Sequence, residues 1–143
     1  MSRYLIVTHQ TALSAELKRT VSSLVAEDPA AEFAVLVPEA PGLTFTWEGE
    51  TVDVARHRAE AAKTLLEETA RARVFRTAVG VPEPLQAITD ELLMHPGYDA
   101  LVISTLPPGI SRWLKLDLVH RAERKFGLRV IHVVAEAPAQ ARP

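Results

Sequence analysis

Short apolar segments alternate along this chain with longer segments in which apolar residues recur every three or four positions. The short segments are rich in β-branched residues, a composition typical of strands buried on both faces. Five strands are predicted, at residues 4–8, 32–38, 73–80, 99–104 and 128–134. The longer segments predict helices at 13–25, 52–73 and 82–94, and a fourth helix that ends near 125–127.

The alternation of strands and helices predicts a single α/β domain. Connections of this kind are right-handed βαβ crossovers, which build a parallel sheet covered by helices on both faces. No internal repeat or linker divides the 143 residues. The domain is therefore expected to span residues 1–137, and residues 138–143 are expected to form a flexible tail.

The composition narrows the classes of function. Apolar residues make up 48% and charged residues 24%, as in a soluble globular protein, and the net charge of −2 gives no nucleic-acid-binding footprint. The chain has no cysteine, which excludes disulfides and thiolate sites, and its histidines show no metal-ligand spacing. The apolar start of the chain is too short for a signal peptide or membrane anchor. We expect a cytoplasmic protein with no metal and no membrane or nucleic-acid partner.

A binding site is expected where the order of the strands reverses, because ligands of open α/β sheets bind there, beyond the carboxyl ends of the strands. If the first strand is central, this crevice lies between the loops at 8–12 and 104–112. The candidate residues in the two loops are Thr8, His9, Ser104, Thr105, Gly109 and Arg112. Hydroxyl groups and a guanidinium fork suit a phosphate or a carboxylate.

Three residues near this crevice have structural alternatives. His9 is equally interpreted as a hydrogen-bonded loop histidine, and Arg112 as part of a solvated, basic helix face. Trp113 is expected to anchor its helix on the sheet. The chain has no Gly-x-Ser-x-Gly elbow, no Walker loop and no Gly-x-Gly-x-x-Gly after a strand. No catalytic residue is assigned, and binding is favoured over turnover.

Five stretches of the chain carry a resemblance to one family. They are "YLIVTH" (4–9), "FAVLVP" (33–38), "AVGVPEPLQAI" (78–88), "YDALVIST" (98–105) and "GLRVIHV" (127–133). Together they resemble the universal stress protein family over almost the full length. The resemblance implies the strand order 3-2-1-4-5, a fold of the adenine-nucleotide alpha hydrolase type, and a homodimer. In such a dimer the pairing residues of the fifth strand are Val130, Ile131, His132, Val133 and Val134.

The loop after the fourth strand departs from the family's ATP-binding pattern. ATP-binding members carry Gly-x-x-Gly, nine residues, and then Gly followed by Ser or Thr. The corresponding positions here hold Ser104, Pro107, Asp117 and Leu118. Pro107 and Pro108 lack the N–H groups that hold phosphate, and Asp117 would repel a triphosphate if it lined the pocket. The ribose-contacting Asp of the family is also missing, because Thr8 and His9 stand there. Val37 corresponds to the apolar wall of the adenine pocket.

Three hypotheses follow from the sequence. In the first, the chain is a dimeric binding protein whose crevice takes an adenine nucleotide or another anion in a non-standard pose. In the second, it is an ATP-binding member with weak hydrolysis that reaches the phosphates through a rebuilt loop. In the third, it is an adaptor whose crevice is filled by its own side chains, and an exposed Trp113 would favour this hypothesis.

Overall fold

The computed structural model describes residues 2–9, 11–39, 48–109 and 111–136, and of residues 48–53 and 112 it describes the backbone. The strands are β1 (Arg3–Val7), β2 (Glu32–Pro38), β3 (Arg73–Gly80), β4 (Ala100–Thr105) and β5 (Arg129–Val134). The helices are α1 (Ala15–Glu27), α2 (Glu48–Thr69), α3 (Pro84–Met94), α4 (Arg112–Lys115) and α5 (Leu118–Phe126). No described helix is long and apolar enough to cross a membrane.

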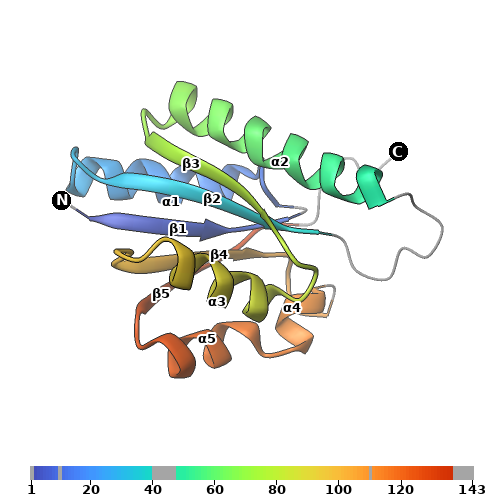
Figure 1. The fold of residues 1–143 in the computed structure, drawn as a ribbon. Coiled ribbons are helices and arrows are strands. Elements are labelled where there is room, and N and C mark those ends of the chain that lie inside the picture. The colour runs from blue at the N-terminus through green and yellow to red at the C-terminus, as the bar shows by residue number, and fades with distance from the viewer. Residues whose placement is uncertain (1, 10, 40–47, 110, 137–143) are drawn as a thin grey trace.

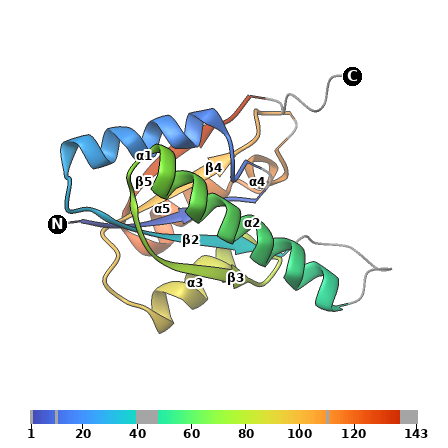
Figure 2. The same ribbon diagram turned by 90° about the horizontal axis from the view of Figure 1, so that it is seen from above.

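The five strands form one sheet in the order β3-β2-β1-β4-β5, and every neighbouring pair is parallel. Helices α1 and α2 cover one face of the sheet, and α3, α4 and α5 lie on the other (Figure 1; Figure 2 shows α1 and α2 nearer the viewer). The predicted doubly wound α/β fold and its strand order are confirmed. β1 is the central strand.

Alternating side chains of the strands supply two separate cores. In β1, Tyr4 and Ile6 belong to the cluster under α1 and α2, whereas Leu5 and Val7 belong to the cluster under α3 and α5. All four are buried, as expected for a strand between two helical layers. Segments in which apolar residues follow one another, with no polar residues alternating between them, therefore become the strands in the middle of the sheet.

Helix α2 packs closely on the sheet through small residues. Ala55, Ala59, Ala62 and Leu66 recur at helical spacing, and each is at most 1% exposed. The helix begins at Glu48, four residues before the predicted start.

The single helix predicted after the fourth strand is two helices. Asp117 separates α4 from α5 with φ 55° and ψ 39°, a left-handed conformation that interrupts a helix. The second helix ends at Gly127, which has φ 65° and whose N–H donates to Glu123 O. The predicted end near 125–127 is therefore confirmed, whereas the break at Asp117 was missed because aspartate is not a helix stop signal.

Strand β3 and helix α3 approach each other at Gly80. A Cβ atom built on Gly80 would lie 2.6 Å from Cβ of Ala87 and 3.2 Å from Cδ1 of Leu36. The turn between them is capped by Glu83, whose carboxylate accepts hydrogen bonds from the N–H groups of Leu85 and Gln86. The segment predicted as the tail, 138–143, lies outside the described residues, and the domain limits stay a prediction.

Candidate functional site

The carboxyl ends of β1 and β4 lie side by side at the predicted crevice, where Val7 pairs with Ile103. Thr8, Thr11 and Ser104 form a chain of buried hydroxyl groups at this point. Thr8 Oγ1 and Thr11 Oγ1 are 3.0 Å apart, and Thr11 Oγ1 is 2.6 Å from Ser104 Oγ. Thr11 thus connects two predicted site residues, Thr8 and Ser104, because it forms a hydrogen bond with the hydroxyl group of each.

Thr105 makes its side-chain contact with the neighbouring strand. Its Oγ1 lies 2.8 Å from Nε2 of His132, and its C=O accepts the N–H of Ala135 at 2.8 Å. Thr105 is 2% exposed, whereas His132 lies at the surface of β5. This hydrogen bond fixes the imidazole ring of His132 against the end of β4.

His9 follows β1 directly and is held by a residue of α2. Nη1 of Arg58 lies 2.6 Å from Nδ1 of His9. A guanidinium has only donors, so Nδ1 accepts this hydrogen bond and the ring proton is on Nε2. Burial, together with the positive charge of Arg58, lowers the pKa of His9 from 6.5 to about 4. The ring is therefore neutral at pH 7.

The Nε2 atom of His9 is buried, and it has no hydrogen-bond partner among the residues that the structure describes. A buried donor without an acceptor costs about 1–3 kcal/mol, and such groups are rare in folded proteins. Its position beyond the end of β1 is where an open α/β sheet binds its ligand. His9 is therefore the predicted site residue with an unused polar atom.

The loop after β4 is a capped turn. The N–H of Ser111 donates to Pro107 O at 3.0 Å, and Ser111 Oγ accepts the N–H of Leu114 at 3.1 Å, which caps α4. Gly109 has φ 91° and is exposed, and no atom lies within 4 Å of the position of a Cβ there. Trp113 is half-buried against the core under α3 and α5, so its expected anchoring role is confirmed.

Two further residues were predicted for the site, Val37 and Arg112. Val37 is 0% exposed and belongs to the core under α1 and α2. Arg112 begins α4, and its side chain lies outside the described part of the chain. The roles of both residues stay predictions.

Asp117 occupies the place of the third glycine of the ATP-binding pattern and keeps the glycine-like backbone. Its positive φ is the conformation that a glycine adopts most easily. The carboxylate is half-exposed and lies beside α5, with Oδ1 2.9 Å from His120 Nδ1 and Oδ2 3.9 Å from Arg124 Nη2. The carboxylate of Asp117 therefore faces the side chains of His120 and Arg124.

Three residues of this region escaped the sequence analysis as site residues: Thr11, Arg58 and Ser111. The spacing of Thr8 and Thr11 in one short polar loop is a local sign that the two hydroxyl groups lie close together. Arg58 is 49 positions from His9, and no pattern in the sequence connects them.

A parallel sheet in the order β3-β2-β1-β4-β5, with polar groups gathered where β1 and β4 end, defines an open, doubly wound α/β protein. No family model matches the sequence, and no curated protein matches it. Solved structures do match, and universal stress proteins are among them.

Three of these structures define the similarity. A universal stress protein in complex with cAMP is 15% identical to this chain, with a TM-score of 0.61, and the match covers 92% of this chain and 96% of the other. The protein of Archaeoglobus fulgidus is 18% identical, with a TM-score of 0.63 and 93% of both chains covered. An AMP-bound family protein of Arabidopsis thaliana is 10% identical, with a TM-score of 0.58, covering 100% of this chain and 96% of the other. The chain therefore has the fold of the universal stress proteins.

Proposed function

We propose that this chain is a binding protein of the universal stress type that holds an adenine nucleotide in a non-standard pose at the carboxyl ends of β1 and β4. The observation that carries the proposal is the Nε2 atom of His9, a buried donor for which the described part of the chain offers no acceptor. Arg58 keeps the proton on this atom, so the ring presents a neutral donor at pH 7. A phosphate oxygen is an acceptor that would satisfy it.

The surroundings of His9 favour a nucleotide with one phosphate over a triphosphate. Pro107 and Pro108 contribute no N–H groups, and the hydroxyl groups of Thr8 and Ser104 already share hydrogen bonds with Thr11. One imidazole donor and the open backbone at Gly109 suit a single phosphate group. Two proteins of this fold are described with cAMP and with AMP bound, and this is the ligand class that we propose here.

Thermal unfolding in the presence of nucleotides tests the proposal. A ligand that binds only the folded state raises the midpoint, and at ten times its dissociation constant the rise is about 4 °C for a chain of this size. We expect AMP or cAMP to produce this rise in the wild type and His9→Ala to abolish most of it. His57→Ala is the matched control, because His57 is an exposed histidine of α2 one position from Arg58.

The outcomes separate the hypotheses. An undiminished AMP response in His9→Ala would show that His9 does not contact the ligand. A rise with ATP that requires magnesium would support the ATP-binding alternative with weak hydrolysis. If no nucleotide raised the unfolding midpoint, the nucleotide proposal would be wrong and the adaptor hypothesis would remain.

The adaptor is the second candidate, and one observation favours it. Thr8, Thr11 and Ser104 satisfy one another at the end of the central strand, and each is at most 4% exposed. A crevice occupied by its own hydroxyl groups needs no ligand to be stable. Against this candidate, Trp113 packs against a core cluster and is half-buried rather than exposed.

We also propose that two copies pair through the free edge of β5. Among the described residues, β5 has β4 as its one neighbour in the sheet, so the other edge of its backbone is unpaired there. Val134 is 41% exposed, and Val130 and Ile131 are half-buried. An apolar edge strand with these exposures is a surface that a second strand covers well. The cytoplasmic location expected from the sequence stays a prediction.

A further inference from the structure

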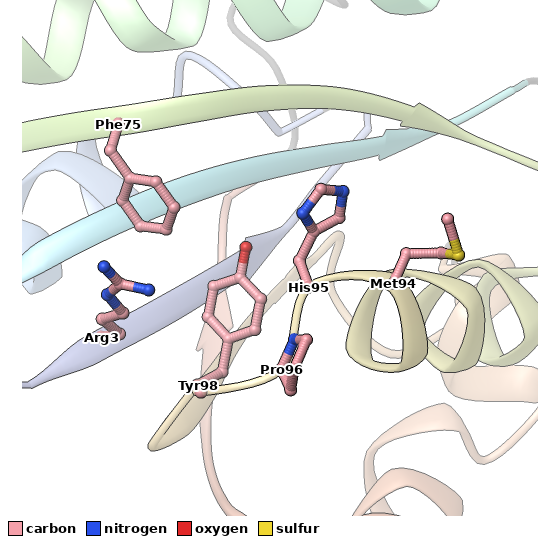
Figure 3. Close-up of a pocket in the computed structure, with 7 residues that line it drawn as sticks. Arg3, Phe75, Met94, His95, Pro96 and Tyr98 are labelled. Carbon is pink, nitrogen blue, oxygen red and sulfur yellow. The ribbon is translucent and has the colours of Figure 1, made fainter.

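A pocket of about 270 Å³ lies at the opposite end of the sheet from the crevice. Its lining comes from Arg3 at the start of β1, from Phe75 near the start of β3, and from residues 94–98, which end α3 and lead into β4 (Figure 3). Strands of a parallel sheet all begin at this end, so the pocket is separated from His9 by the length of β1.

Phe75 is directed into the pocket by an irregularity in β3. The register of β2 and β3 shifts here, because Phe33 pairs with Val74 and Ala34 pairs with Arg76, which leaves Phe75 without a partner in the ladder. A bulge of this kind changes the direction of a side chain. The ring of Phe75 is 43% exposed although it is a large apolar group. It stacks on Tyr98 with a centroid distance of 6.2 Å.

Tyr98 is fixed in the pocket wall by a buried ion pair. Its hydroxyl group donates to Glu91 Oε2 at 2.9 Å, and Arg76 donates to both oxygens of the same carboxylate at 2.8 and 3.1 Å. Glu91 is 5% exposed and Tyr98 is 8% exposed. Because the hydroxyl group is bonded to Glu91, the aromatic ring is the part of Tyr98 that the pocket presents (Figure 3).

Arg3 is the charged end of the pocket. Its Nε donates to Glu32 Oε1 at 2.9 Å, and its guanidinium carbon lies 4.8 Å from the centroid of the Phe75 ring. The Arg3 backbone is held by Asp99 through two hydrogen bonds of 2.8 Å. Among the described residues no acceptor is found for the Nη1 and Nη2 atoms, and the side chain is 43% exposed. The Nη edge of the guanidinium is therefore available to an anion.

We propose that this pocket binds a small aromatic carboxylate. The aromatic ring would pack against Phe75, Tyr98 and the apolar part of residues 94–96, and the carboxylate would accept hydrogen bonds from the Nη atoms of Arg3. A cavity of about 150 Å³ holds one benzene molecule, so this pocket has room for a ring with a short acidic arm. Arg3 is a planar donor of the kind that carboxylates prefer. His95 adds a second polar group to the lining.

The probe is 3-phenylpropionate, titrated into the full-length, ¹⁵N-labelled protein. We expect saturable changes in the backbone amide signals of Phe75, Gly97 and Tyr98, with a dissociation constant on the order of 1 mM for a ligand of this size. The uncharged analogue 3-phenylpropanamide is expected to bind about tenfold more weakly, because it cannot form the ion pair with Arg3.

Two pairs of variants locate the site. Arg3→Gln is expected to weaken binding about fivefold, whereas Arg19→Gln, which changes an exposed arginine of α1, leaves it unchanged. Met94→Glu adds a negative charge at the pocket and is also expected to weaken binding about fivefold. Leu93→Glu is its control, because Leu93 and Met94 are both 75% exposed but Leu93 does not line the pocket. Substitutions at such exposed positions leave the fold intact.

Three results would overturn this proposal. The first is the absence of saturable changes, and the second is equal affinity for the acid and the amide. The third is that the ligand changes the amide signals of Thr8 and Gly109 and not those of Phe75, Gly97 and Tyr98. The first two results leave the nucleotide proposal untouched, because the pocket and the crevice lie at opposite ends of the strands. The third would place the aromatic acid in the crevice proposed for the nucleotide.

Discussion

A single residue, His9, gains its chemical character from a partner that the local sequence does not contain. Arg58 accepts no hydrogen bond and so selects the tautomer of the imidazole ring, and its charge adds to the effect of burial on the pKa. The position of His9 after the first strand was predictable from the apolar segment that precedes it. Its protonation state was not, because it depends on the packing of α2 over the end of β1.

The low pKa of His9 predicts how stability changes with pH. The pKa is about 4 in the folded protein and 6.5 in the reference state, so the unfolded chain binds more protons between these values. Stability is therefore fully present above pH 6.5 and decreases as the pH falls toward 4. With allowance for partial exposure, we expect His9 to account for a loss of about 1 kcal/mol between pH 7.5 and 5.

Urea unfolding of the wild type and of His9→Gln at the two pH values measures this contribution. Burial also lowers the pKa of His132, and this adds a similar dependence to both proteins. The change in the free energy of unfolding between the two pH values is therefore compared for the two proteins, and the difference between these changes reports on His9. Equal changes would contradict the assigned pKa.

At the level of elements, the packing of α3 on β3 depends on the absence of one side chain. The methyl group of Gly80→Ala would lie 2.6 Å from Cβ of Ala87, closer than any real contact of this kind. We expect Gly80→Ala to destabilise the protein by about 2 kcal/mol, because a close-packed interface does not accept an added methyl group without strain. Chemical denaturation measures the loss.

The double variant Gly80→Ala/Ala87→Gly isolates the contact between the two positions. Ala87→Gly alone costs about 1 kcal/mol through its lower helix propensity. It also removes the atom that the new methyl group meets, so the double variant is expected to be more stable than the sum of the two losses predicts. Simple additivity would show that the strain at Gly80 has another source.

The elements were predictable from the sequence where local rules decide them. Ser14 accepts the N–H of Leu17 at the start of α1 as a capping residue does, and the buried segments became the five strands. The break at Asp117 and the bulge at Phe75 were not predictable, because the backbone there follows from tertiary packing. The polar segments after β1 and β4 were also predictable, whereas the hydrogen bond from Thr11 to Ser104 spans 93 positions and no local rule predicts it. The binding role of these segments stays a prediction.

For the whole molecule, the free edge of β5 predicts an oligomeric state. Lysine on an edge strand opposes pairing with a second strand, since the charge would be buried in the new interface. We expect the wild type to be a dimer and Val134→Lys to be a monomer by size-exclusion chromatography with light scattering. The control is Val54→Lys, which changes an exposed valine of α2. A monomeric wild type, or a dimeric Val134→Lys, would contradict pairing through β5.

The central position of β1 has a consequence for the chain as it is translated. β1 leaves the ribosome before the other four strands of this sheet, and β2 follows it closely, but β4 begins only at Ala100. Until then one edge of β1 is unpaired. The residues along this edge include Leu5, Ile6 and Val7, which are 0% exposed in the finished fold. Such an edge pairs readily with other nascent chains. The central strand is therefore the part of the chain most in need of protection during synthesis, and the crevice beside it is completed only when β4 has been made.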